Sequence, residues 1–250
     1  MDHFFTVLGG MGTAATESYL RLLNARTPAA KDQDYLDYLL VNHASVPDRT
    51  AYILDHRQPS FLPPLLQDIR QQSQLHPDFF VVVCNTAHYF YQALQAATPI
   101  PILHMPHLAV RHLSAQFPTA HRVGLIATQG SIADGVYAKE ISATGREVVL
   151  GDAALQDAVS ELIYTHIKQQ GTVDAALYHQ ILARMQTEFQ VDVTVLGCTE
   201  LSLAQEKAPT HPYPVIDAQS LIVDLSLQLA LAFRRDPAAG RALLAQLMAD

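Results

Sequence analysis

The chain has 250 residues, of which 49% are hydrophobic and 16% are charged, a composition that excludes a disordered or fibrous protein. Its 16 basic and 24 acidic residues give a net charge of −8 without any basic cluster, so we expect it to bind neither nucleic acid nor an anionic membrane. No signal-peptide pattern and no apolar run of about 18 residues is visible, which favours a cytoplasmic protein. The spacing of its two cysteines matches neither a disulfide framework nor a zinc site, and we expect no metal.

Short apolar strands alternate with amphipathic helices along the chain, which predicts an α/β fold with parallel sheets. The first strand, Phe4–Leu8, runs into a glycine-rich turn, GGMGT, and a helix. Further strands are expected at Tyr38–Val41, Phe79–Val83, Pro99–Met105, Arg122–Ala127, Val148–Leu150, Val191–Leu196 and Pro214–Asp217. Helices are expected at Phe61–Gln74, Leu108–Phe117, Leu155–Gln170, Tyr178–Phe189, Leu221–Phe233 and Pro237–Asp250.

Both cysteines directly follow buried strands. Cys84 follows FFVVV and precedes Asn85 and Thr86, and Cys198 follows VTVLG and precedes Thr199. Open α/β sheets bind ligands at this carboxyl edge, and the helix starts that follow would lower the thiol pKa. A lone cysteine is more often a small buried hydrophobic residue. The pair in matching settings instead favours one shared site.

The order of features repeats once along the chain. A strand with a Gly/Thr turn, a strand with a cysteine, and a proline-led strand occur in the same order in both halves. The repeat predicts two similar Rossmann-like lobes related by a pseudo-twofold axis, with the active site in the cleft between them. We place residues 1–104 and 215–250 in the first lobe and residues 105–214 in the second.

Two thiols on opposite faces of a carbon acid can remove a proton from one face and return it to the other, which is racemisation or epimerisation. The negative charge that develops on the substrate carboxylate needs hydrogen-bond donors. Amide and hydroxyl side chains of the right type are Asn85, Thr86, Thr128 and Thr199. A disulfide between the two cysteines would abolish this chemistry.

Several other polar residues have two readings. Arg49 follows a strand on the same edge as Cys84, but a surface ion pair fits it equally well. Lys168 lies in the last turn of a helix, where it can simply complement the helix dipole. The histidines form no HExxH or other close ligand pair, and we interpret His88 and His104 as structural.

The chain resembles the cofactor-independent aspartate/glutamate racemase superfamily, most closely its aspartate racemase branch. The matching motifs are LGGMG (Leu8–Gly12), PDRT (Pro47–Thr50), CNTAHYFY (Cys84–Tyr91), IPILHM (Ile100–Met105), LIATQGS (Leu125–Ser131), IYTHIK (Ile163–Lys168) and LGCTEL (Leu196–Leu201). The resemblance implies two Rossmann-like lobes, often in a homodimer, without pyridoxal phosphate, metal or nucleotide. It implies Cys84 and Cys198 as catalytic bases and a dicarboxylic amino acid as substrate. The substrate-binding residues that it implies are Met11, Arg49, Asn85, Thr86, Thr128, Lys168, Thr199 and Glu200.

The sequence also departs from the family pattern near the expected substrate. Thr13 stands where the family usually has proline after GGMG, and His43-Ala44 stands where an Asn-Pro pair is common. The choice between aspartate and glutamate therefore stays open. The main expectation is racemisation of aspartate, with glutamate as a second substrate. The alternatives are another superfamily activity on a small dicarboxylic acid, such as a maleate isomerase-like one, or an amino-acid-binding protein without turnover.

Overall fold

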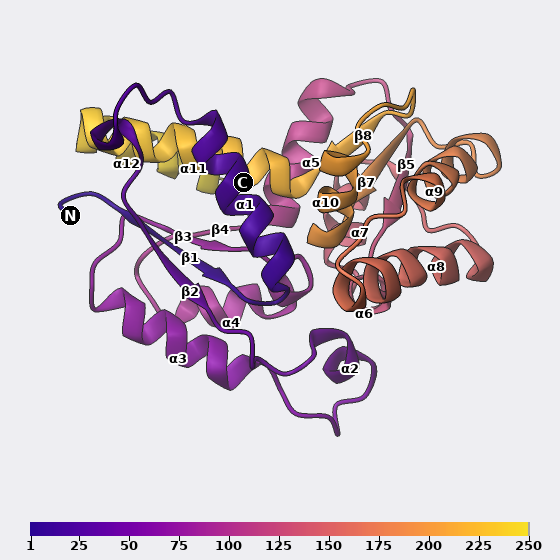
Figure 1. The fold of residues 1–250 in the computed structure, drawn as a ribbon, viewed down its shortest axis with the longest axis horizontal. Coiled ribbons are helices and arrows are strands. Elements are labelled where there is room, and N and C mark those ends of the chain that lie inside the picture. The colour runs from indigo at the N-terminus through magenta and orange to yellow at the C-terminus, as the bar shows by residue number, and fades with distance from the viewer. Residues whose placement is uncertain (250) are drawn as a thin grey trace.

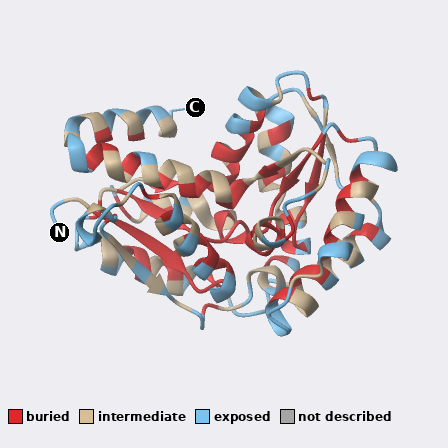
Figure 2. Ribbon diagram, turned by 45° about the horizontal axis from the view of Figure 1, so that its top comes forward, coloured by how far each residue is buried: buried red, intermediate tan, exposed pale blue. Residues whose placement is uncertain are grey.

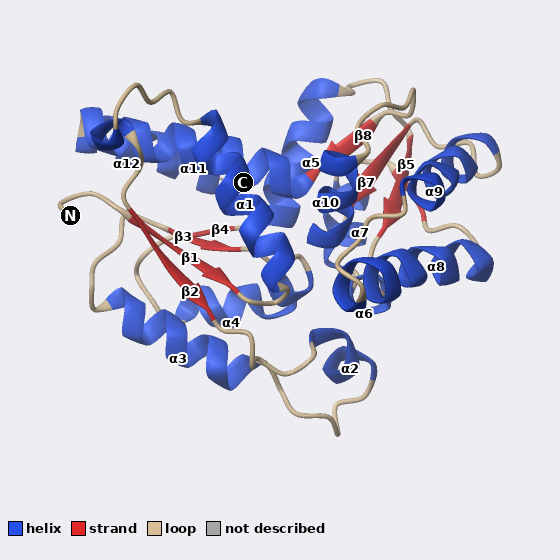
Figure 3. Ribbon diagram, viewed as in Figure 1, coloured by secondary structure: helices blue, strands red, loops and turns tan. Residues whose placement is uncertain are grey.

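In a computed structural model that describes residues 1–249, the chain forms two parallel four-stranded sheets (Figure 1). The first sheet has the order β2-β1-β3-β4, and the second has the matching order β6-β5-β7-β8. Figure 3 shows the sheets as separate groups of strands with helices around them. The predicted α/β fold with two similar lobes is thus confirmed. The strands are β1 (Phe5–Gly9), β2 (Tyr38–Asn42), β3 (Phe80–Val82), β4 (Ile102–Leu103), β5 (Arg122–Ile126), β6 (Glu147–Val149), β7 (Val193–Leu196) and β8 (Val215–Asp217).

Helices connect consecutive strands and cover both sheets. They are α1 (Thr13–Arg26), η1 (Asp32–Asp34), α2 (Arg49–Leu54), α3 (Leu62–Ser73), η2 (Thr86–Phe90), α4 (Tyr91–Ala96), α5 (Met105–Gln116), α6 (Gln129–Asp134), α7 (Val136–Ala143), α8 (Ala153–Ser160), η3 (Glu161–Gln169), α9 (Ala175–Thr187), α10 (Thr199–Lys207), α11 (Ala218–Arg235) and α12 (Pro237–Met248). No helix in this described part of the chain is both long and apolar enough to span a membrane.

The strands in the middle of each sheet read as continuous apolar runs because helices cover both of their faces. Every residue of β1, β3 and β7 is buried, whereas the edge strand β2 is only partly covered. Figure 2 shows this burial concentrated in the strands and in the helix faces turned toward them.

The end of the second lobe differs from the predicted boundary. β8 pairs with β7, so residues 215–217 belong to the second sheet rather than to the first lobe. The cause is the repeat itself, since β8 follows β7 as β4 follows β3. The chain then returns through α11, where Tyr19 of α1 donates a hydrogen bond to Ser226 (2.8 Å), and the ring of Phe233 lies 6.4 Å from that of Phe79.

Three predicted segments differ in detail. The helix expected at Leu155–Gln170 consists of the α-helix α8 followed by a π-helix, η3. The helix after Cys84 begins with a 3-10 turn, η2, and the strand expected at Pro99–Met105 pairs over two residues only. The predicted last helix is α12, which ends at Met248, and Asp250 lies outside the described residues.

Candidate active site

Four equivalent strand ends meet at one pocket. Met11, Cys84, Thr128 and Cys198 each lie two residues beyond the last residue of β1, β3, β5 and β7, respectively, and all four line this pocket. Because parallel strands end at a common edge, each lobe contributes two of these positions. The two carboxyl edges therefore face each other, as the internal repeat predicts.

All ten predicted site residues line the same pocket, and the remaining three lining residues are Asp48, Thr50 and Tyr164. The cavity between them is small, about 10 Å³, which is roughly the room for one water molecule. The two cysteines are buried and free, each with 4% of its surface exposed. The lobes are thus closed over the site.

Cys198 is held as a protonated thiol by its surroundings. It is the N-cap residue of α10, and its Sγ donates a hydrogen bond to Glu200 Oε2 at 2.9 Å. Burial raises the pKa of the Cys198 thiol well above its ordinary value, and the negative charge of Glu200 raises it further. The expected lowering by the helix start is therefore wrong for Cys198, because desolvation and a neighbouring carboxylate outweigh the helix dipole.

Lys168 forms an ion pair with the carboxylate of this thiol–carboxylate pair. Its Nζ lies 3.4 Å from Glu200 Oε1 and 5.3 Å from the centre of the Tyr164 ring. Burial lowers the pKa of Lys168, but nearby negative charge, above all that of Glu200, raises it by more, so the net shift is upward. Lys168 is therefore a permanently charged, partly exposed group at the pocket wall rather than only a complement to a helix dipole.

Arg49 is fixed from the other lobe by backbone carbonyls. Its Nη2 donates to Met11 O (2.8 Å), and its Nη1 donates to the carbonyls of Val46 and Pro47, at 3.2 Å each. Asp48 caps α2 by accepting from Ala51 N, which positions Arg49 as the first helical residue. The surface ion pair considered for Arg49 is thus replaced by a guanidinium group anchored at the pocket wall.

The amide and hydroxyl side chains form the floor of the pocket. Thr86 Oγ1 is hydrogen bonded to Thr128 Oγ1 (3.1 Å) and Ser131 Oγ (2.9 Å), a contact between the two lobes. Asn85 Oδ1 accepts from Tyr137, whereas Asn85 Nδ2 is buried without a partner among the described residues. An unpaired buried donor at a pocket wall is a ready hydrogen-bond donor for a ligand.

Tyr164 was not predicted as a site residue. It lies on the π-helix η3, and its hydroxyl donates to Thr50 Oγ1 at 3.1 Å. Tyr164 and Lys168 are four residues apart, so their side chains lie on the same face of this helix. The only sequence signal was their occurrence together in the IYTHIK motif.

His88 holds the backbone next to Cys84 through hydrogen bonds. Its Nδ1 donates to the carbonyl oxygen of Cys84 (2.9 Å), and its Nε2 accepts from Met105 N (3.3 Å). Burial lowers the pKa of His88 and keeps the imidazole neutral. The structural role expected for this residue agrees with these contacts.

Comparisons with known proteins agree with this architecture. The broad specificity amino-acid racemase RacX of Bacillus subtilis is 22% identical over 237 residues, which cover 91% of this chain and 98% of that protein. A glutamate racemase of Aquifex aeolicus is 26% identical over 133 residues, 52% of this chain and 49% of that protein. The aspartate racemase of Picrophilus torridus has a similar fold, with a TM-score of 0.76 at 24% identity over 91% of this chain and 94% of its own.

A family model described as Asp/Glu/Hydantoin racemase matches residues 8–225, a span that contains every residue of the pocket. The match thus includes both lobes and both strand-end cysteines. The chain therefore belongs to the Asp/Glu/Hydantoin racemase family.

Proposed function

We propose that the protein racemises a dicarboxylic amino acid, aspartate first and glutamate second, by proton transfer between Cys84 and Cys198. The observation that carries this proposal is the convergence of both thiols on one pocket from equivalent strand ends of the two lobes. A racemase needs an acid on one face of the α-carbon and a base on the other. Cys198, protonated and bonded to Glu200, supplies the acid, and Cys84 as a thiolate supplies the base.

In the reverse direction the roles exchange. Cys198, which becomes a thiolate when its proton passes to the α-carbon, then removes the α-hydrogen, and Cys84, which holds the proton it took, protonates the opposite face; Glu200 Oε2 accepts the hydrogen bond of Cys198 whenever the thiol is protonated. The positive charge of Lys168 stabilises the thiolate that forms. Both half-reactions thus draw their acid and their base from the two thiols.

The α-carboxylate is the group on which charge develops when the α-proton leaves. Asn85 Nδ2, with no partner among the described residues, is placed to donate to it. Arg49, anchored by three carbonyl groups, offers its remaining N–H donors to a carboxylate. Donors that are fixed before the reaction stabilise the charged intermediate without a reorganisation cost.

Substrate entry requires the lobes to separate, because the closed cavity has room for about one water molecule. α2 closes the pocket toward the second lobe through Thr50, which contacts Gly130 and accepts from Tyr164. We infer that α2 moves away with the first lobe to admit the amino acid. Its return would bring Arg49 onto the substrate and exclude water.

The test is deuterium exchange at the α-carbon of enantiopure aspartate in D₂O, without added cofactor, followed by proton NMR and chiral chromatography. Wild-type protein should incorporate deuterium from either enantiomer. Cys84→Ser and Cys198→Ser should each abolish racemisation, and each should lose exchange with a different enantiomer, so that each variant is the control for the other. Wild-type exchange in both single variants would disprove the two-thiol mechanism, and aspartate binding without exchange in wild type would indicate a binding protein.

A second candidate is a racemase of broad specificity. It is favoured by the ion pair of Lys168 with Glu200, because the charge of Lys168 is already balanced before a second substrate carboxylate arrives. The relative from Bacillus subtilis, matched over nearly its full length, carries that description. A panel of enantiopure amino acids in the same exchange assay separates the two: selectivity for aspartate and glutamate supports the first candidate, and similar rates with neutral amino acids support the second.

A further inference from the structure

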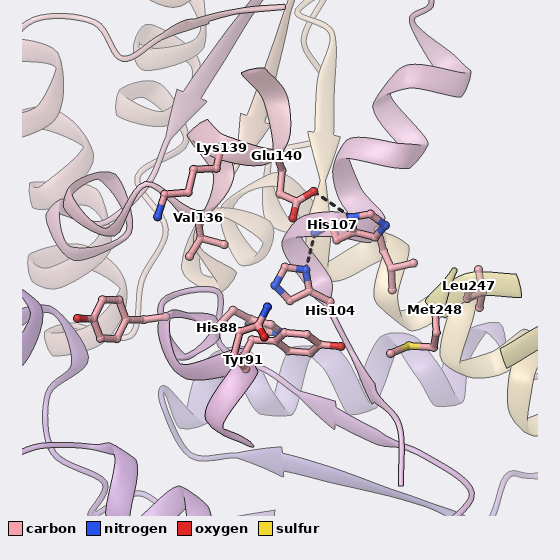
Figure 4. A pocket seen from close by; sticks show the side chains of 12 residues that line it. His88, Tyr91, His104, His107, Val136, Lys139, Glu140, Leu247 and Met248 are labelled. Atoms are coloured by element: carbon pink, nitrogen blue, oxygen red, sulfur yellow. Dashed lines mark hydrogen bonds and ion pairs between the residues drawn. The ribbon is translucent and has the colours of Figure 1, made fainter. Parts of the chain in front are cut away.

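A second cavity, separate from the active-site pocket, contains a cluster of potential metal ligands (Figure 4). This cavity has a volume of about 340 Å³ and shares no lining residue with the active site. His104, His107 and Glu140 line it, and each offers one ligand atom within 4.8 Å of the others. All three side chains are partly buried.

The fold brings these residues together from two helices. His104 is the N-cap residue of α5, and His107 lies in the first turn of that helix, so the two side chains lie on the same side. Glu140 comes from α7, which packs against α5. His107 Nδ1 and Glu140 Oε2 are 2.9 Å apart.

Two features describe the imidazole nitrogens of the cluster. His104 Nδ1 accepts a hydrogen bond from His107 N at 3.2 Å, so this nitrogen carries no proton, and a metal ion bound there would take the place of that N–H donor. His107 Nε2 is buried without a partner among the described residues, so the hydrogen bonding of the cluster is incomplete. Figure 4 shows both imidazoles and the Glu140 carboxylate turned toward one another.

We propose that His104, His107 and Glu140 bind a divalent transition-metal ion of the Zn²⁺ or Co²⁺ class. Two imidazole nitrogens and one carboxylate oxygen are a ligand set that such ions accept, with a further position left for water or a small anion. The cavity provides room for that ligand. The sequence could not indicate this site because Glu140 lies 33 residues beyond His107.

The ion would connect the start of α5 to α7. α5 is the link between β4 of the first sheet and β5 of the second, so an ion at its first turn would stabilise the junction of the lobes. The ring of His104 lies 5.4 Å from that of His88, which bonds the Cys84 carbonyl oxygen. Only the His88 side chain therefore lies between the proposed metal site and the backbone carbonyl of Cys84.

The experiment is a Co²⁺ titration of chelator-treated full-length protein, followed by visible and near-ultraviolet absorption. Co²⁺ on nitrogen and oxygen ligands gives visible bands, whereas Co²⁺ on Cys84 or Cys198 would add a thiolate charge-transfer band. We expect one Co²⁺ per chain with visible bands and without the thiolate band. In the same sample, paramagnetically shifted imidazole N–H signals of two histidines should appear, which tests the site in the wild-type chain.

Variants identify the ligands. His104→Asn retains an oxygen that can cap α5 but removes the imidazole, and Glu140→Gln retains a hydrogen-bond acceptor but removes the charge. Each should weaken Co²⁺ binding by about 100-fold or more, since even the loss of an outer-shell partner costs 10–100-fold. His112→Gln, on the exposed face of the same helix, is the matched control and should bind like wild type. Circular dichroism verifies that the variants are folded.

A site at these residues also predicts that Co²⁺ raises the thermal unfolding midpoint of wild type and of the His112 variant, but not of the other two. The proposal is overturned by an absence of binding in wild type, by a thiolate band at the first equivalent, or by unchanged affinity in both ligand variants. Absence of the two shifted imidazole signals from the cobalt-loaded wild type would overturn it as well.

Discussion

The ion pair of Lys168 and Glu200 should contribute measurably to stability as well as to the chemistry of the pocket. Nζ and Oε1 are 3.4 Å apart, and the Glu200 side chain is 3% exposed. Two unit charges at this distance attract by about 5 kcal/mol at an effective dielectric constant of about 20. Desolvation and the ordering of the lysine side chain offset much of this attraction. We therefore expect a coupling free energy of about 1–3 kcal/mol.

A double-mutant cycle measures this coupling. Urea unfolding at pH 7 gives the free energies of unfolding of wild type, Lys168→Met, Glu200→Gln and the double variant. Lys168→Met alone should destabilise by about 3 kcal/mol, because it leaves Glu200 as an unpaired buried charge, and the double variant should lose less than the sum of the two. The exposed pair Arg184–Glu188 is the control and should couple more weakly. A coupling at Lys168–Glu200 no larger than the control value would refute this account.

Three further outcomes follow from the site and its surroundings. Burial and the Glu200 charge raise the Cys198 pKa, so activity toward the enantiomer that Cys198 deprotonates should rise with pH above neutrality. Removing the charge with Glu200→Gln should move this rise to lower pH. A pH–rate profile that does not shift in this variant contradicts the assignment. Burial raises the pKa of Asp134 from 3.8 to about 6, so its ionisation destabilises the folded state increasingly as pH rises from about 4 to 6. Asp134→Asn should then leave the urea midpoint unchanged at pH 4 and, after allowance for partial exposure, raise the free energy of unfolding by about 1 kcal/mol at pH 8. Equal effects of the substitution at both pH values contradict this reasoning. A Cβ at Gly130 would lie 2.8 Å from Thr50 Cα, so Gly130→Ala should prevent full closure of α2. The variant should raise KM more than it lowers kcat. An unchanged KM would show that this contact does not control closure.

The sequence predicted the parts of this structure that depend on local pattern. Buried strands appear as apolar runs, and the residues after them appear as small polar or thiol side chains, so Cys84 and Cys198 could be placed at strand ends from the sequence alone. The repeat then predicted that the two strand ends face each other. The pattern placed Arg49 on the edge of Cys84 but left a surface ion pair equally open, and it did not place Lys168 or Glu200, so the prediction that all three bind substrate rested on the family resemblance.

What sequence could not supply was the electrostatics of the closed site. The pKa of Cys198 depends on how deeply it is buried and on a carboxylate two residues away, and neither is visible in helix-start patterns. The π-helix was likewise hidden, since one extra residue in a turn leaves no signature in an apolar periodicity. Residues 215–217 were wrongly assigned to the first lobe because the predicted lobe boundary came before the last strand of the second repeat.

The distribution of polar and apolar contacts between the lobes determines how the pocket can open. On the pocket side, the lobes meet through hydrogen bonds such as Thr86–Thr128 and Tyr164–Thr50, each worth about 0.5–1.5 kcal/mol. Away from the pocket, one apolar core includes buried residues of both sheets and of α5 and α11. Breaking a few hydrogen bonds costs far less than exposing that core, so separation should occur at the pocket while the shared core stays packed. This geometry favours a hinge near α5 and α11, and it explains how a site with room for about one water molecule can admit an amino acid.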